Sequence, residues 1–171
     1  KRLVNGMLQY SRLERLEALP EEEEVDLSQL VELVSEEQML NSRKGITLEC
    51  RVEPGLAIRG NTELLVRLLT NLISNAYRYG RAGGHIMVGA FGREEEICIS
   101  VRDDGIGMEQ HEMDRIFHRF YQADAARCSR DHSLGLGLSM AAEIARLHHA
   151  RISVESERGK GSEFLVIFMK R

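Results

Sequence analysis

Asn71 and Asn75 stand four residues apart in a segment that is otherwise rich in leucine. In a helix, side chains at this spacing project from one face. An amide oxygen can ligate a hard cation, which suits the Mg²⁺ that accompanies phosphate groups. The alternative is that both asparagines are exposed residues or local caps, as most asparagines are. The pair therefore indicates a metal–phosphate site only if other groups converge on it.

A regular apolar pattern predicts the helix that carries this pair. Its apolar positions recur every three or four residues, and they are Leu64, Leu65, Leu68, Leu69, Leu72, Ile73 and Ala76. Asn61 is the predicted N-cap and Gly80 the predicted stop.

A carboxylate beside two glycines follows the next well-patterned segment. Ile97, Ile99 and Val101 alternate with more polar residues, which predicts a strand, and the sequence 103–107 (Asp-Asp-Gly-Ile-Gly) comes directly after it. A carboxylate at a strand end can accept a hydrogen bond from the amino group of adenine, and glycine lets a ligand approach the backbone closely. The alternative is an ordinary Asp-Gly turn.

Two further glycines stand where a third patterned segment begins. Gly135 and Gly137 precede a predicted helix over 138–147. Free N–H groups and the helix dipole attract phosphate at such a position. By itself a Gly-Leu-Gly sequence also fits a flexible loop. Each motif is weak alone, but the three in this order predict a pocket for ATP.

These motifs resemble those of the catalytic and ATP-binding domain of bacterial sensor histidine kinases, in the wider group that includes gyrase, heat-shock chaperone and mismatch-repair ATPases. The similarity extends over about 25–170. Residues 71–80 resemble the family's N box, 101–108 its G1 box, 116–121 its F box and 133–139 its G2 box. The resemblance implies a two-layer α/β sandwich, the Bergerat-type ATP-binding fold, with a mixed, mostly antiparallel sheet packed on about three helices.

The resemblance also implies roles at the phosphate end of the pocket. Asn75 would bind Mg²⁺ and Asn71 would contact the phosphates. Arg78 stands where the family often has a basic phosphate contact, and Arg119 would contact the γ-phosphate. The triphosphate would be lined by the G2 residues Gly135, Leu136, Gly137 and Leu138. Asn71, Asn75 and Arg119 are therefore the expected catalytic residues.

At the base end, the resemblance places Tyr79 against the adenine and Asp103 on its amino group. Gly105 and Gly107 would shape the pocket and hinge a lid that runs from about 121 to 134. This lid segment is polar, as expected of a loop that closes over a nucleotide.

The residue at position 71 separates kinase from hydrolase. Related hydrolytic ATPases carry Glu four positions before the Mg²⁺-binding Asn, whereas the amide of Asn71 cannot act as a general base. Glu63 lies two helical turns before Asn71 and would not reach the same atoms. The expected reaction is transfer of the γ-phosphoryl group of Mg·ATP to a histidine, for relay to a response-regulator aspartate.

The sequence departs from the family pattern at two positions. Ile106 replaces a frequent proline in G1, which is expected to be tolerated because proline there fixes a backbone angle and does not contact the ligand. Ser133 replaces the usual first glycine of G2, and together with the altered lid it keeps other function classes open. A nucleotide-sensing or docking module would bind ATP and transfer nothing. A hydrolytic ATPase, against which Asn71 argues, would release phosphate steadily.

Composition excludes some other classes. The 23 Lys and Arg against 27 Asp and Glu give 23 − 27 = −4, which argues against a nucleic-acid-binding surface. The three cysteines are scattered without metal-ligand spacing and are expected to be reduced thiols. No apolar run approaches the roughly 18 residues of a membrane span, and no signal peptide is visible.

The resemblance divides the chain into three parts. Residues 1–19 resemble the C-terminal end of a dimerisation and phosphoacceptor helix, 20–24 form an acidic linker, and 25–171 are the catalytic ATP-binding domain. No histidine has a phosphoacceptor context, so a longer sensor kinase is expected. Its partners would be ATP, the histidine-bearing dimerisation domain of the same kinase and a response-regulator receiver domain. The parent is expected to be a membrane-associated homodimer of the bacterial inner membrane, with this domain in the cytoplasm.

The remaining patterns predict the other elements. Helices are expected over 2–18, from 28 to about 44 with Gly45 as cap, and over 112–119; strands over 25–27, 46–52, 57–59, 85–91, 97–102, 151–156 and 163–169.

Overall fold

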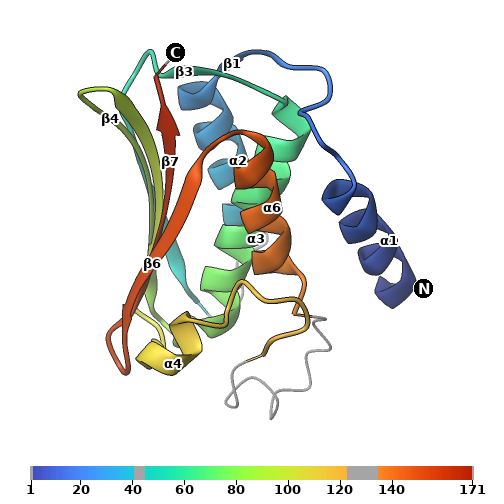
Figure 1. Ribbon diagram of the computed structural model, residues 1–171. Helices are drawn as coiled ribbons and strands as arrows, with labels where there is room; N and C mark the ends of the chain where they lie inside the picture. Colours follow the sequence, from blue (N-terminus) through green and yellow to red (C-terminus); the bar gives the residue numbers. More distant parts are fainter. Residues whose placement is uncertain (1, 41–44, 123–134, 171) are drawn as a thin grey trace.

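A five-stranded sheet with helices on one face forms most of the molecule (Figure 1). The structure, a computed structural model, describes residues 2–40, 45–122 and 135–170. Its helices are α1 Arg2–Glu14, α2 Leu27–Leu40, α3 Thr62–Tyr79, α4 Gln110–Met113 and α6 Gly137–Leu147. Its strands are β1 Glu23–Asp26, β2 Thr47–Val52, β3 Ala57–Gly60, β4 His85–Arg93, β5 Glu96–Asp103, β6 Arg151–Glu157 and β7 Gly161–Met169.

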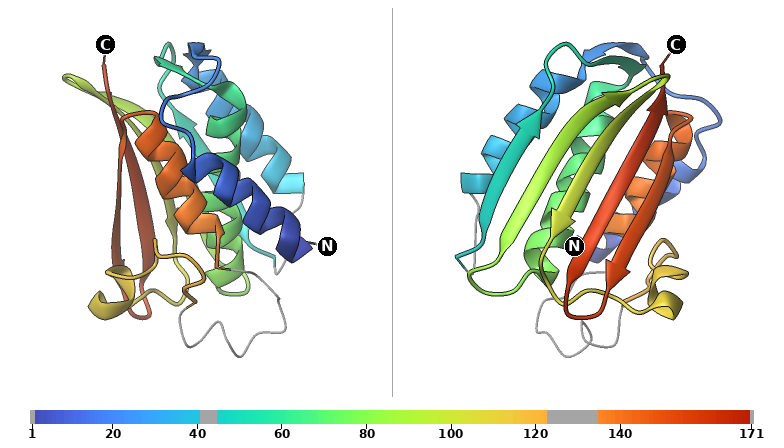
Figure 2. Two further views of the ribbon diagram at one scale, coloured as in Figure 1. Left: turned by 45° about the vertical axis from the view of Figure 1, so that its right-hand side comes forward. Right: turned by 90° about the vertical axis from the view of Figure 1, so that its left-hand side faces the viewer.

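The strand order of the large sheet is β2-β4-β5-β7-β6. The β2–β4 pair is parallel, and every other neighbouring pair is antiparallel. Helices α2, α3 and α6 lie behind the sheet, as the right-hand view of Figure 2 shows. Strands β1 and β3 form a separate antiparallel pair. The predicted two-layer sandwich with a mixed, mostly antiparallel sheet on about three helices is confirmed.

Helix α3 lies at the centre of the core. Its apolar stripe is almost wholly buried, with Leu68, Leu69, Leu72 and Ile73 at 0% exposure, and it packs between α2, α6 and the inner face of the sheet. Burying one such side chain contributes about 1.5–3 kcal/mol. The stripe therefore fixes which face of α3 is left for the polar residues.

Two helices are shorter than their sequence patterns predicted. The first ends at Glu14 rather than 18. The helix expected over 112–119 is instead the single turn α4. The Glu112 side chain accepts the Glu109 N–H at 2.9 Å as part of a capping box, which fixes where this turn begins. Ile116 and Phe117, which follow in turns rather than in a helix, still pack on the core.

The acidic segment predicted as a linker is partly a strand. Glu23 and Glu24 belong to β1 and pair with Gly60 and Arg59 of β3, although their side chains are exposed. The division of the chain at 19 and 24 stays a prediction. Within the described ranges, no helix is long and apolar enough to cross a membrane.

Candidate functional site

Helix α3 is bounded as the sequence predicted and holds both asparagines. Asn61 caps its start by accepting the Leu64 N–H at 2.9 Å. Gly80 ends it with φ −63°, so the glycine is not required by a left-handed conformation. It is required by close packing, because a Cβ there would stand 2.7 Å from the Ala76 carbonyl oxygen and 2.8 Å from the Ile46 side chain.

Asn71 faces the start of α6. Its Oδ1 atom lies 3.8 Å from the place where a Cβ on Gly137 would stand. Its Nδ2 atom is buried and has no hydrogen-bond partner among the described residues. Leu136, the N-cap of α6, makes no side-chain cap, so the first N–H groups of the helix lack that partner. An orphan amide opposite an uncapped helix start is a suitable arrangement for phosphate oxygens.

Asn75 and Arg78 continue the same face of α3 toward its C-terminus, and both are half-buried. The Arg78 guanidinium lies 5.7 Å from the centroid of the Tyr79 ring. The described residues contain no group of three or more His, Cys, Asp or Glu that could hold a metal. A magnesium ion would therefore fit here only with phosphate and water oxygens beside an amide such as that of Asn75.

Asp103 is a buried carboxylate at the far end of the site, with 5% exposure. Its Oδ1 accepts the Gly105 N–H at 2.8 Å. Burial raises the pKa of Asp103, and the backbone hydrogen bonds from Gly105 and Ser162 oppose that rise. A buried carboxylate with acceptor capacity left is suited to an amino group on a ligand.

The turn after Asp103 packs on the end of α3. A Cβ on Gly105 would overlap the carbonyl group of Tyr79, and the Ile106 N–H donates to the Tyr79 oxygen at 3.2 Å. Burial raises the pKa of the Tyr79 phenol. The Tyr79 backbone and the Asp103 carboxylate thus both lie against Gly105, and their roles toward adenine stay predictions.

Gly107 does not have the surroundings expected of a lid hinge. Its φ is +62°, and a Cβ there would overlap the carbonyl oxygen of Glu157 at the end of β6. This packing favours a fixed turn over a hinge.

The carboxylate of Asp104, next to Asp103, is bonded to other parts of the protein. Asp104 accepts the His85 N–H at 2.9 Å with Oδ1 and pairs with the Arg81 guanidinium at 3.1 Å through Oδ2. Burial alone would raise the pKa of Asp104, but the hydrogen bond from the His85 N–H and the contacts with Arg81 together outweigh it, so the pKa is lowered. Asp103 makes no ion pair among the described residues, so it is the better candidate for ligand recognition.

Arg119 is held by α1. Its Nη2 lies 2.8 Å from Glu14 Oε1, and its guanidinium lies 5.2 Å from the centroid of the Tyr10 ring. Arg67 and Arg146 also hold this part of the chain, by donating to the Gln9 side chain and to the Leu16 carbonyl. In this structure Arg119 therefore binds a side chain of α1, and the predicted γ-phosphate contact stays a prediction.

The G2 residues have different surroundings. Gly135 has φ +64° and accepts the Phe120 N–H at 3.0 Å, which ties it to the F-box segment. Leu136 is buried in the core and could line a ligand only with its backbone, whereas Leu138 is half-buried. Ser133 and residues 123–134 of the predicted lid lie outside the described residues.

The sequence analysis missed Gly161 and Ser162, which pack against Asp103 from the neighbouring strand β7. Gly161 has φ +97°, and a Cβ there would overlap the Asp103 carbonyl oxygen. Ser162 pairs directly with Asp103 in the β5–β7 register. The sequence analysis predicted only the strands 151–156 and 163–169 on either side of Gly159 and Gly161. The available signal was a glycine at the first residue of a strand, but its partner depends on strand pairing that the pattern does not reveal.

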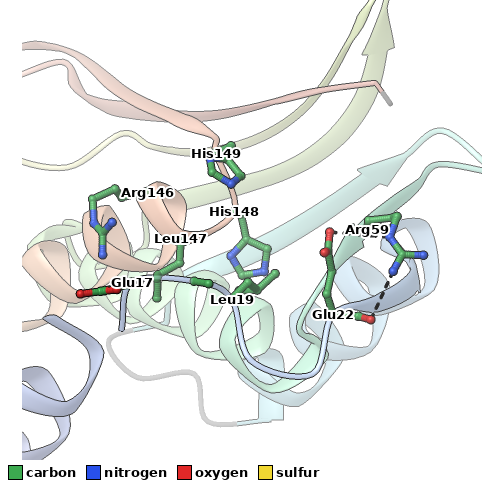
Figure 3. A pocket seen from close by; sticks show the side chains of 9 residues that line it. Glu17, Leu19, Glu22, Arg59, Arg146, Leu147, His148 and His149 are labelled. Atoms are coloured by element: carbon green, nitrogen blue, oxygen red, sulfur yellow. Dashed lines mark hydrogen bonds and ion pairs between the residues drawn. The ribbon is translucent and has the colours of Figure 1, made fainter. Parts of the chain in front are cut away.

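A cavity of about 190 Å³ lies away from this site. It is lined by the segment 17–22, Arg59 and the last turn of α6 (Figure 3). His148 in its wall is fully used, because its Nε2 accepts the Asn61 N–H at 3.1 Å and its Nδ1 donates to the Ile144 carbonyl at 2.8 Å. Arg59 pairs with Glu22. His148, Arg59 and Glu22 thus already have partners within the protein, so this cavity is a poorer candidate for a nucleotide site than the one along α3.

The comparisons with known proteins agree on one family. The family described as "Histidine kinase-, DNA gyrase B-, and HSP90-like ATPase" matches residues 60–171. The heme sensor protein HssS of Staphylococcus saprophyticus is 33% identical over 169 residues, which cover 98% of this chain and 36% of HssS. The sensor histidine kinase WalK of Bacillus subtilis is 30% identical over 164 residues, 94% of this chain and 27% of WalK. The chain thus spans well under half the length of these relatives.

Solved structures share the fold. Full-length ShkA in complex with AMPPNP superposes with a TM-score of 0.86 at 26% identity and covers 99% of this chain and 36% of ShkA. Histidine kinase ThkA in complex with the response regulator TrrA gives a TM-score of 0.77 at 22% identity, covering 99% of this chain and 48% of ThkA.

Proposed function

Because this chain belongs to the histidine kinase-, DNA gyrase B- and HSP90-like ATPase family, we propose that it is the ATP-binding catalytic part of a sensor histidine kinase. The observation that carries the proposal is the pairing of two features along α3. The buried amide nitrogen of Asn71, which has no hydrogen-bond partner among the described residues, faces the start of α6. The buried carboxylate of Asp103 packs near the other end of the helix at Tyr79. Eight residues of helix separate the two ends by about 12 Å.

Each residue has a binding role in this proposal. Asp103 accepts a hydrogen bond from the adenine amino group, and Tyr79 packs against the base. Asn71 and the first N–H groups of α6 hold the phosphates, and Asn75 is a ligand of Mg²⁺. The metal would neutralise charge on the phosphate oxygens during transfer. Positioning and charge neutralisation are what phosphoryl transfer chiefly needs from a protein.

The proposed acceptor is a histidine on a dimerisation hairpin outside residues 1–171, of which α1 would be the C-terminal end. Asn71 supplies no general base for water, which favours transfer over hydrolysis. ThkA binds a response regulator, and we propose a partner of the same class here, with relay to its aspartate. A membrane-associated homodimeric parent with this domain in the cytoplasm completes the proposal.

Calorimetric titration with a non-hydrolysable ATP analogue, with and without Mg²⁺, tests the site. Wild type should bind saturably, and Asn75→Ala should lose the Mg²⁺-dependent part of the affinity. Ser74→Ala, an exposed neighbour on α3, is the matched control and should bind like wild type. Unchanged Mg²⁺ dependence in Asn75→Ala would refute its assignment.

Transfer is tested by supplying a histidine-bearing hairpin and labelled ATP. Label should appear on the hairpin only when ATP and Mg²⁺ are both present. Binding without transfer to any supplied hairpin would favour a nucleotide-sensing module, and steady phosphate release without transfer would favour a hydrolase.

A further inference from the structure

Ser156 interrupts an apolar pattern on strand β6. Ile152 and Val154 occupy the preceding positions of the same face, and both are partly buried against the core. Alternation predicts an apolar residue at the next such position, which is 156. The residue there is instead a half-buried serine, so its hydroxyl needs an explanation.

The Ser156 hydroxyl joins three groups. It donates to the Gly161 carbonyl at 2.8 Å, accepts the Met108 N–H at 2.8 Å and lies 3.0 Å from the Ser162 hydroxyl. A serine hydroxyl offers one proton and two acceptor positions. When Ser162 donates the third bond, the capacity of Ser156 is complete.

Two of these contacts lead to Asp103. The Gly161 carbonyl and the Ser162 N–H belong to one peptide group. Ser162 pairs with Asp103 in the sheet register, and its backbone N–H acts on the Asp103 carboxylate and helps to lower its pKa. Met108 lies at the other end of the turn that begins at Asp103. Ser156 therefore bonds two parts of the Asp103 surroundings. One is the peptide group whose N–H, that of Ser162, acts on the Asp103 carboxylate, and the other is Met108 at the end of the turn that follows Asp103.

We propose that Ser156 is a positioning residue for Asp103, acting through the peptide group between Gly161 and Ser162 and through the Met108 N–H. A hydrogen bond to a carbonyl polarises its peptide and strengthens the N–H as a donor. Without the hydroxyl, that peptide group is free to tilt, and the Met108 N–H loses its partner. The proposal rests on the proposed function only where it gives Asp103 the adenine amino group.

The ionisable groups near Asp103 come from the elements packed around it. They are Tyr79 at the end of α3, Arg81 and Asp104 beside the turn, Glu157 at the end of β6, and Lys160 on the β6–β7 turn. Arg81 is paired with Asp104, and Lys160 with Glu157. None of these pairs involves Ser156, so replacing the serine leaves them in place.

The test measures Asp103 directly. NMR titration of the side-chain carboxyl carbon gives its pKa in the nucleotide-free protein, for wild type, Ser156→Ala, Ser156→Thr and Ser153→Ala. Ser153 lies on the same strand, is exposed and serves as the matched control. Ser156→Ala should raise the Asp103 pKa, Ser156→Thr should restore it because the hydroxyl is kept, and Ser153→Ala should leave it unchanged.

Binding of a non-hydrolysable ATP analogue gives the functional readout. Ser156→Ala should weaken it about fivefold at pH 7, the scale of one lost hydrogen bond. Circular dichroism melting confirms that each variant is folded. An unchanged Asp103 titration in a folded Ser156→Ala protein would overturn the positioning role. If Ser156→Ala shifts the Asp103 titration but the wild-type protein binds no ATP analogue, the positioning role would stand and the proposed function would be overturned.

Discussion

The base end of the site and the Arg119 contact are held in different ways. Around Asp103, buried main-chain groups are in close contact, and a Cβ at Gly105 or Gly161 would overlap a backbone carbonyl oxygen. Arg119 instead meets Glu14 through an ion pair whose two side chains are 51% and 43% exposed. Exposed pairs contribute little to stability. The base end is therefore part of the fold itself, whereas Arg119 can change partners at little cost.

The sharpest test of this difference is Gly161→Ala. The added Cβ would overlap the Asp103 carbonyl at a residue with φ +97°, so we expect a loss of roughly 3 kcal/mol or more in the free energy of unfolding. Gly159→Ala on the same turn is the control. It has φ +82° with no described heavy atom within 4 Å, and should cost about 1 kcal/mol. Urea unfolding followed by circular dichroism measures both, and equal losses would contradict the role given to packing.

Asp103→Asn probes recognition rather than stability. Removing the charge should weaken binding of an ATP analogue by about 1.5–3 kcal/mol, or tenfold and more. Asp104→Asn is its control, because that carboxylate already bonds the His85 N–H and Arg81. Calorimetry that finds the larger loss in Asp104→Asn would reverse the assignment of the two carboxylates.

His148 extends the comparison to a second buried contact. Its Nε2 accepts the Asn61 N–H, and burial lowers its pKa below the ordinary value of 6.5. The folded protein then binds fewer protons than the unfolded chain just below that pH, so stability should fall as the pH drops through 6.5 toward the lower folded pKa. One such group changes the free energy by at most about 1.4 kcal/mol per pH unit.

Urea midpoints between pH 5 and 7.5 measure this effect. His148→Gln should flatten the acid side of the profile, although its midpoint at pH 7.5 falls. His149→Gln, at the exposed neighbouring residue, should keep the wild-type slope. The same slope in all three proteins would assign the acid loss to other groups.

The smallest expected change in stability is that of Glu14→Gln. Losing an exposed ion pair should cost less than about 1 kcal/mol. Because the substitution frees Arg119, affinity for an ATP analogue should rise severalfold if Arg119 is a γ-phosphate contact. Glu17→Gln, on the segment just after α1, is the control. Lower affinity in Glu14→Gln would show that Arg119 and nucleotide do not compete.

The sequence was sufficient where the signal is local. The apolar stripe of α3 and its caps Asn61 and Gly80 predicted the helix, and alternation at Ile97, Ile99 and Val101 predicted β5. The Tyr79 backbone and the Asp103 carboxylate both lie against Gly105, while their predicted roles toward adenine stay predictions. These features depend on neighbours within a few residues or on one periodic pattern.

Long-range contacts could not be predicted in the same way. The partner of Arg119 is 105 residues away in sequence, and nothing near either residue indicates the other. Gly161 and Ser162 support Asp103 only through the β5–β7 register. The helix expected over 112–119 is only the single turn α4, which ends at Met113.

The order of the strands leaves β2 and β6 at the two edges of the large sheet. Within the described chain, neither has a second strand neighbour, so each has backbone groups on which another protein could add a strand. Both carry charged side chains along their length, Glu49 and Arg51 on β2 and Arg151, Glu155 and Glu157 on β6. Such charges disfavour edge-to-edge aggregation. The strand that supplies Ser156 is thus also one that keeps separate copies of the sheet from joining.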